Sequence, residues 1–215
     1  MTREAVVRRI VEIGIVPVVR AASGTEAIAI ADAIDAGGIH LLEITMTVPG
    51  AVDTIAEAVA RYGDRFLIGA GTVLDAEQAG ACIAAGARFI VSPIVDEETI
   101  AACRAANVAV LPGALTPTEV VRAWRAGADF VKVFPCSAVG GPAYIKALKA
   151  PLPDIPLVPT GGVTLQTVGA FFAAGASAVG VGGDLCDLQA IRSGHSKKIV
   201  TAARAYAAAA AERSL

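Results

Sequence analysis

The chain has 215 residues, of which 55% are hydrophobic, so it is long enough for one well-filled domain and short for two. Its formal net charge of -2 argues against nucleic acid or an anionic membrane surface as the main partner. No apolar run approaches the roughly 20 residues that cross a bilayer, and the charged N-terminus is unlike a signal peptide, which together favour a cytoplasmic protein.

Short apolar runs rich in Val and Ile alternate along the chain with Ala-rich segments of helical spacing. Continuous apolar runs are typical of strands that are buried on both faces, as in a parallel sheet. Eight such runs predict strands at 13–19, 39–45, 66–70, 89–92, 108–112, 130–134, 157–160 and 178–181. The segments between them predict crossover helices, for example at 26–36, 51–62 and 118–126.

The two ends of the chain also have helical composition. Residues 3–12 predict an extra helix that closes the bottom of a barrel, and 196–212 predict its last outer helix. Several helices are followed by a glycine that can adopt the left-handed C-cap conformation, at Gly37, Gly86, Gly127 and Gly175. Eight βα units without a linker predict a single (β/α)8 TIM barrel domain over 1–215, with an open doubly wound sheet as the alternative.

Two charged residues lie inside predicted strands. Strand side chains alternate between faces, so Leu42 and Ile44 would face the helices and Glu43 would point into the barrel. Lys132, between two valines, would point inward by the same argument. An amine in that apolar setting has a lowered pKa, as a nucleophile requires. The alternative is a structural ion pair between Glu43 and Lys132.

Further candidates lie where strands end, because functional groups of a TIM barrel collect there. Arg20 could hold a carboxylate or phosphate, or form a rim salt bridge. Thr72 shares the face of Ala70 and could direct its hydroxyl into the mouth or cap a turn. Pro93 would line the pocket with apolar surface. Gly-rich turns after the seventh and eighth strands are typical of a phosphate cradle, and they contain Gly161, Gly162, Gly182 and Gly183.

Four cysteines lie far apart in the sequence, at 82, 103, 136 and 186, without CxxC spacing. This pattern predicts separate free thiols and not a zinc site.

Seven segments in the same order carry a family resemblance that spans roughly 13–185. The sequence resembles the class I aldolases of 2-keto-3-deoxy-6-phosphogluconate (KDPG), which often also act on 4-hydroxy-2-oxoglutarate (KHG). The matching segments are 14–20, 42–50, 68–73, 89–93, 111–117, 131–135 and 158–163.

The resemblance implies a role for several residues. Lys132 matches the lysine that forms a Schiff base, Glu43 the acid/base that transfers protons, and Thr72 a contact to the pyruvyl carboxylate. Arg20 matches an arginine at the mouth of the site. Thr160 matches the position that influences the stereochemical preference at C4.

The remaining positions concern the walls of the pocket and the phosphate. The resemblance implies that Gly161, Gly162 and Gly182 form the phosphate cradle, and Phe134 is expected to exclude water from the lysine. Thr47 stands where some members have an arginine. Gly183 stands where the family often has Ser, so one hydroxyl donor to a phosphate would be missing.

The activity implied is cleavage of KDPG to pyruvate and glyceraldehyde 3-phosphate, and of KHG to pyruvate and glyoxylate, without metal or cofactor. The partner implied is a small 2-keto acid, and the family's assembly implies a homotrimer. Two other functions stay open from the residues alone: a phosphosugar isomerase or epimerase, and a catalytically silent barrel that binds a phosphorylated ligand or a partner protein.

Overall fold

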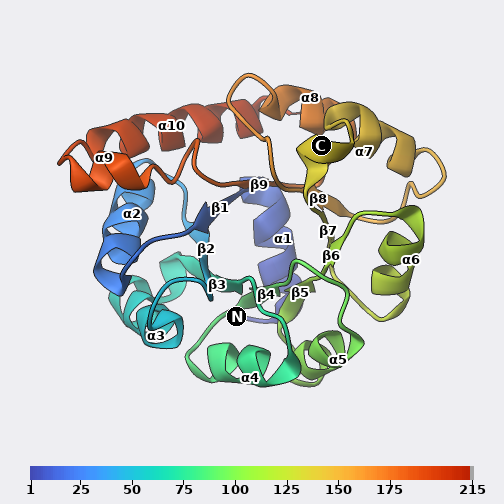
Figure 1. The fold of residues 1–215 in the computed structure, drawn as a ribbon, viewed down its shortest axis with the longest axis horizontal. Helices are drawn as coiled ribbons and strands as arrows, with labels where there is room; N and C mark the ends of the chain where they lie inside the picture. The colour runs from blue at the N-terminus through green and yellow to red at the C-terminus, as the bar shows by residue number, and fades with distance from the viewer. Residues whose placement is uncertain (214–215) are drawn as a thin grey trace.

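The computed structural model describes residues 1–213 and shows parallel strands in a ring with helices around it (Figure 1). The strands are β1 (Ile15–Val19), β2 (Leu41–Thr45), β3 (Leu67–Gly71), β4 (Phe89–Val91), β5 (Ala109–Leu111), β6 (Gly113–Ala114), β7 (Val131–Val133), β8 (Leu157–Pro159) and β9 (Val179–Val181). The helices are α1 (Arg3–Ile13), α2 (Gly24–Ala36), α3 (Ala51–Tyr62), α4 (Ala76–Ala84), α5 (Glu97–Ala105), α6 (Pro117–Arg125), α7 (Pro142–Lys149), α8 (Val168–Ala173), α9 (Leu188–Arg192) and α10 (Lys197–Ala211), with 3-10 turns η1 (Gly63–Arg65) and η2 (Cys136–Val139).

The eight predicted strand regions all contain a strand, and the differences lie at the ends of elements. Ile13 belongs to α1 and not to a strand, because Gly14 has a φ of 72° and ends the helix there. The left-handed glycine after a helix is confirmed at Gly86, Gly127 and Gly175. After α2 the left-handed residue is Gly38, and the predicted Gly37 keeps right-handed helical geometry with a φ of -83°.

The strands form two parallel sheets instead of the one closed eight-stranded sheet that the sequence predicts. One sheet has the order β5-β4-β3-β2-β1-β9 and the other β6-β7-β8. The predicted fifth strand is divided at Pro112, which has no backbone N–H to donate to a sheet. Its first half, β5, pairs with β4, and its second half, β6, pairs with β7. At the opposite seam, a single isolated bridge joins Thr160 to Gly180.

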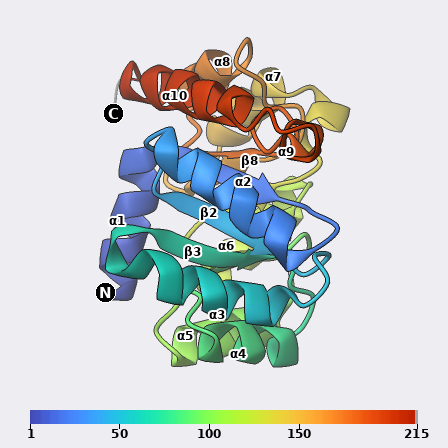
Figure 2. The ribbon, with the colours of Figure 1, turned by 90° about the vertical axis from the view of Figure 1, so that its left-hand side faces the viewer.

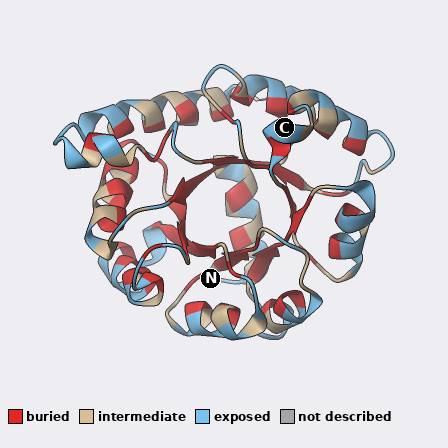
Figure 3. Cartoon of the chain, in the orientation of Figure 1, coloured by how far each residue is buried: buried red, intermediate tan, exposed pale blue. Residues whose placement is uncertain are grey.

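The strands and the parts of the helices that face them are buried (Figure 3). Two hydrophobic cores lie on the two faces of the strands. The outer core packs the helices against strand residues such as Leu42 and Ile44. The inner core fills the ring with residues such as Leu41 and Phe130. The alternation predicted for β2 and β7 is therefore confirmed, and it determines which side chains enter the ring.

Helix α1 closes one end of the ring (Figures 1 and 2). Val6 and Ile10 of α1 belong to the inner core and are buried. The guanidinium of Arg3 lies 3.6 Å from Asp129 Oδ1, and the other oxygen of this carboxylate accepts a hydrogen bond of 2.9 Å from Val110 N–H. These contacts leave the opposite end of the ring, where the strands terminate, as the accessible one.

The domain predicted over 1–215 extends beyond the described residues only at 214–215. Among the helices within 1–213, none combines the length and apolar character needed to cross a membrane.

Candidate active site

The ring interior holds two charged side chains, Glu43 from β2 and Lys132 from β7. Glu43 is 1% exposed and Lys132 3% exposed, and the strand neighbours of both pack in the outer core. In the sheet Glu43 pairs with Gly69, and Lys132 lies between Gly113 and Val158. The structure therefore confirms that the pattern of the two strands directs both groups inward.

Small residues make room for the Glu43 carboxyl group. A Cβ atom at Gly71 would lie 2.6 Å from Glu43 Oε1, so glycine at this position of β3 lets the carboxyl group keep its place. Oε1 is buried, and among residues 1–213 it has no hydrogen-bond partner. A buried polar oxygen without a partner is costly, which makes it a candidate to bind a ligand or water.

Burial acts on the two groups in opposite directions. It raises the pKa of Glu43, and the positive charges of Lys132 and Arg20 oppose this only in part. It lowers the pKa of Lys132, an effect that Arg20 reinforces and Glu43 opposes. Desolvation thus favours the uncharged form of each group.

Glu43 and Lys132 are not in direct contact. None of the ion pairs within residues 1–213, defined by an N to O distance of at most 4.0 Å, joins these two side chains. Lys132 Nζ instead lies 5.0 Å from the centre of the Phe134 ring. The structural ion pair that the sequence left open is therefore absent as a direct contact.

A pocket of about 330 Å³ opens at the ends of β1, β7, β8 and β9. Phe134 lines it, and so does Thr160, whose side chain needs a glycine at position 180 because a Cβ there would clash with the threonine hydroxyl. Arg20, Gly161, Gly162, Gly182 and Gly183 complete the set of predicted residues in its lining.

The Gly-rich turn after β8 presents unused hydrogen-bond donors to this pocket. Gly161 and Gly162 have φ values of 94° and 75°, a conformation that favours glycine. The N–H groups of Gly161, Gly162 and Val163 have no acceptor among residues 1–213. Such backbone donors can bind a phosphate or a hydroxyl group.

Five predicted residues do not line this pocket. Glu43 and Lys132 lie buried in the ring interior, and Phe134, which Lys132 approaches, is in the pocket lining. The other three are Thr47, Thr72 and Pro93. The sequence predicts that Thr72 shares an inward face with Ala70. This argument is wrong, because Ala70 packs in the outer core. Thr72 has a φ of 59°, so the chain leaves the extended conformation and strand alternation does not determine its direction. Pro93, half-buried after β4, packs against the start of β6, where a Cβ at Gly113 would clash with its backbone.

The proton of Thr47 is already used within the protein. Thr45 Oγ1 donates to the carbonyl of Val19 at 3.0 Å and lies 2.7 Å from Thr47 Oγ1. Since a hydroxyl has one proton, Thr47 must be the donor in the second hydrogen bond. Its oxygen keeps only acceptor capacity toward the mouth, which is the wrong polarity for binding a carboxylate.

Sequence reasoning missed several residues of the pocket, above all Asp184 and Thr164. Asp184 directly follows the Gly182-Gly183 pair, so its position was a usable signal for a residue at the pocket. Within residues 1–213, no group of three or more His, Cys, Asp or Glu side chains is arranged to hold a metal ion.

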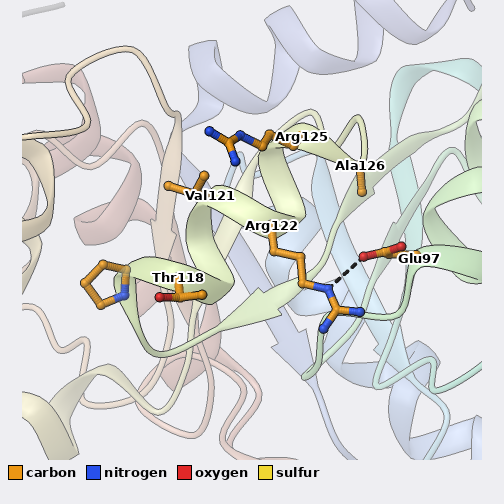
Figure 4. Close-up of a pocket in the computed structure, with 7 residues that line it drawn as sticks. Glu97, Thr118, Val121, Arg122, Arg125 and Ala126 are labelled. Carbon is orange, nitrogen blue, oxygen red and sulfur yellow. Dashed lines mark hydrogen bonds and ion pairs between the residues drawn. The ribbon is translucent and has the colours of Figure 1, made fainter.

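A larger hollow of about 670 Å³ lies on the outer layer between α5 and α6 (Figure 4). Its Arg122 and Glu97 form an ion pair of 2.7 Å, and both side chains are more than half exposed. This hollow lacks the buried, unpartnered groups of the ring interior, and we therefore place the site at the strand ends.

Comparison with known proteins gives one family. The family model of KDPG and KHG aldolases matches residues 6–202. The chain is 38% identical to the 2-dehydro-3-deoxy-6-phosphogalactonate aldolase of Escherichia coli K12 over 80% of this chain and 83% of that protein. It is 36% identical to a 2-dehydro-3-deoxy-phosphogluconate aldolase of Pseudomonas aeruginosa, covering 75% of this chain and 73% of that one.

A similar solved structure is the KDPG aldolase of Legionella pneumophila with pyruvate captured at low pH as a covalent carbinolamine intermediate. It superposes with a TM-score of 0.85 and 29% identity, over 92% of this chain and 97% of that one.

Proposed function

The chain belongs to the KDPG and KHG aldolase family, and on this premise we propose that it cleaves KDPG to pyruvate and D-glyceraldehyde 3-phosphate through a Schiff base on Lys132. Membership makes the chain an aldolase, a carbon–carbon lyase. The observation that carries the assignment to Lys132 is a buried amine of lowered pKa that faces the same interior as the buried Glu43. KHG, with glyoxylate as its second product, is a further substrate. The relatives favour this lyase over an isomerase or a silent barrel.

The reaction begins with the neutral amine of Lys132, because only the unprotonated nitrogen has a lone pair to attack the C2 ketone. Burial and the positive charge of Arg20 lower the pKa of Lys132 and so increase the neutral fraction. Addition gives a carbinolamine. Its hydroxyl takes the proton of Glu43 and leaves as water, which gives an iminium ion and the Glu43 carboxylate. That cation then accepts electrons from the C3–C4 bond.

Glu43 removes the proton of the C4 hydroxyl as the C3–C4 bond breaks. The bond electrons form the C2–C3 double bond of an enamine, the iminium nitrogen regains its lone pair, and the aldehyde leaves. In the free enzyme burial raises the pKa of Glu43. Formation of the iminium cation favours the carboxylate, since a nearby positive charge stabilises it, so the base is generated at the step that needs it.

Glu43 next returns its proton to C3 of the enamine, which gives the iminium of pyruvate. Water adds to C2, the proton released returns to the Glu43 carboxylate, and pyruvate leaves as the neutral amine of Lys132 is restored. Phe134 and Pro93 provide apolar walls that limit the access of bulk water to the amine.

The ends of the substrate bind to the strand termini. Thr72 and nearby backbone groups bind the pyruvyl carboxylate, since the Thr47 hydroxyl has its proton in a hydrogen bond to Thr45. Arg20, which lies beside the turn after β9, faces the far end of the substrate. Thr160, buried beside the pocket, contacts the C4 region. The N–H groups of the turns that contain Gly161, Gly162, Gly182 and Gly183 bind the far end.

We also infer that the two sheets act as one eight-stranded barrel, with β5 and β6 as halves of its fifth strand. Two observations support this: Lys132 N–H donates to Pro112 O at 2.9 Å, and a bridge joins Thr160 to Gly180. We take residues 1–215 as one domain. From the resemblance we propose a homotrimer, and native mass spectrometry should give three copies of the 21.6 kDa chain.

The mechanism is tested by borohydride reduction in the presence of pyruvate, followed by intact mass and peptide mapping. We expect one reduced pyruvyl adduct, located on Lys132. Lys132→Ala should lose both the adduct and turnover while keeping its circular dichroism spectrum. The matched control is Lys197→Ala, at the exposed start of α10, which should keep both. An adduct that persists in Lys132→Ala would place the nucleophile elsewhere.

A further inference from the structure

The pocket at the Gly-rich turns contains two charged residues of opposite sign, Arg20 and Asp184. Arg20 follows β1 and is exposed to the pocket, and among residues 1–213 it has no ion-pair partner. A Cβ atom at Gly182 would lie 3.8 Å from a terminal nitrogen of Arg20, so the guanidinium lies beside the turn after β9. Asp184 belongs to the same turn, two residues further on.

The Asp184 carboxylate is held in place by two donors from other elements. Tyr206 of α10 donates its hydroxyl proton to Asp184 Oδ2 at 2.5 Å, and Leu165 donates its backbone N–H to the same oxygen at 3.3 Å. Tyr206 is completely buried, so its hydroxyl cannot move away freely. The negative charge is therefore a permanent part of the pocket wall.

These charges act differently on the two groups that could occupy the far end of the pocket. A phosphate dianion is attracted by Arg20 and repelled by Asp184, so the two effects oppose each other. A hydroxymethyl group is neutral and can donate its proton to the carboxylate, which a phosphate dianion cannot do. The unused N–H groups of Gly161 and Gly162 can donate to either group.

We propose that Asp184 determines substrate specificity by compensating the charge of Arg20, so that this pocket accepts 2-keto-3-deoxy acids ending in a free hydroxymethyl group as well as those ending in a phosphate monoester. The proposal rests on the proposed aldolase function. Gly183 also supports the proposal, because it offers no side-chain donor to a phosphate.

The test compares kcat/KM for KDPG with kcat/KM for the same acid without its phosphate, in the wild type and in Asp184→Asn. The amide oxygen of Asn can still accept from Tyr206 and Leu165, so the change removes the charge and keeps the hydrogen bonds. We expect the ratio of kcat/KM for KDPG to kcat/KM for the unphosphorylated acid to rise by roughly fivefold to tenfold. This is the expected effect of one unit charge on a dianion several ångströms away in a solvated pocket. The ratio cancels any loss that is common to both substrates.

The matched control is Asp154→Asn, an exposed residue before β8 at the other end of that strand, which removes the same charge and should leave the ratio unchanged. An unchanged ratio in Asp184→Asn, or an equal rise in both variants, would overturn the proposal. If Asp184→Asn does not fold, the KM of the wild type for KDPG is measured as a function of ionic strength instead. Charge compensation predicts that this KM changes little with ionic strength. A steep increase of the KM would contradict the proposal. Borohydride trapping on Lys132 in the same preparations reports separately on the proposed function.

Discussion

At the scale of single residues, Lys132 and Glu43 derive their chemistry from burial. Each group is almost completely buried, and desolvation is the largest influence on the pKa of both. Their mutual attraction opposes that influence without reversing it, because the groups do not touch. In the free enzyme, burial therefore shifts Lys132 toward the neutral nucleophile and Glu43 toward the protonated acid.

The first prediction concerns pH. Since the pKa of Lys132 is lowered from 10.5, the amine stays neutral at a lower pH than an exposed lysine would. The rate of pyruvate adduct formation should be constant at high pH and fall as pH decreases through this lowered pKa, because protonation removes the lone pair. Rapid-quench borohydride trapping across a pH series measures it. A midpoint at or above 10.5 would contradict the desolvated environment.

The second prediction concerns proton transfer by Glu43. Glu43→Gln keeps the shape of the side chain but removes the titrating group, so turnover should fall by roughly 10²- to 10⁴-fold. The pyruvate adduct should still form on Lys132, because the amine is untouched. The control Glu57→Gln, on the exposed face of α3, should keep wild-type kcat. Wild-type turnover in Glu43→Gln would remove Glu43 from the mechanism.

At the scale of elements, the strands expose their polar residues at one end of the ring, and α1 seals the other. The seal consists of apolar contacts from Val6 and Ile10 and of the polar link from Arg3 to Asp129. The contacts of α1 that stabilise the fold and the groups that carry the chemistry therefore lie at opposite ends of the ring. A change in α1 should affect folding without reaching the amine of Lys132.

The third prediction tests this separation. Ile10→Ala removes a completely buried side chain from the inner core, and should lower the free energy of unfolding by about 2–5 kcal/mol. At temperatures where the variant is folded, kcat should equal that of the wild type. Arg8→Ala, an exposed position on the same helix, should change stability by no more than about 0.5 kcal/mol. Urea denaturation and steady-state kinetics provide both quantities, and a large loss of kcat in folded Ile10→Ala would show that the two ends are coupled.

At the scale of the whole molecule, four free thiols report on how completely the helical layer covers the strands. They lie in α4, α5, η2 and the turn after β9, and all four are buried. Burial raises the pKa of Cys82 to about 11, of Cys103 to about 12 and of Cys136 to about 11, and it raises that of Cys186 as well. At neutral pH almost no thiolate is present on the folded chain.

The fourth prediction follows from this distribution. A thiol reagent should find no reactive cysteine in the native protein and four in the urea-unfolded protein, because the thiolate is the reactive form and must be exposed. Spectrophotometric titration before and after unfolding measures both numbers. A native thiol that reacts as fast as in urea would reveal a part of the helical layer that opens separately.

Periodicity and residue type were sufficient for the strand regions, for the inward direction of Glu43 and Lys132, and for the Gly-rich turns. These features are local, since alternation along one strand assigns each side chain to a face. Family membership was also readable from ordered motifs in the sequence. The division of the fifth strand at Pro112 does not follow from proline alone, because Pro17 lies inside β1 without dividing it, so only the paired strands reveal it.

Three features depended on contacts between residues distant in the sequence. Asp184 acquires its place in the pocket wall through Tyr206 and Leu165, and Thr47 loses its donor through Thr45 and Val19. The lack of direct contact between Glu43 and Lys132 depends on where β2 and β7 lie in the ring, and these two strands are far apart in the sequence. Electrostatic energies and hydrogen-bond direction depend on distances through space, which a linear pattern does not contain, so only the tertiary structure could decide them.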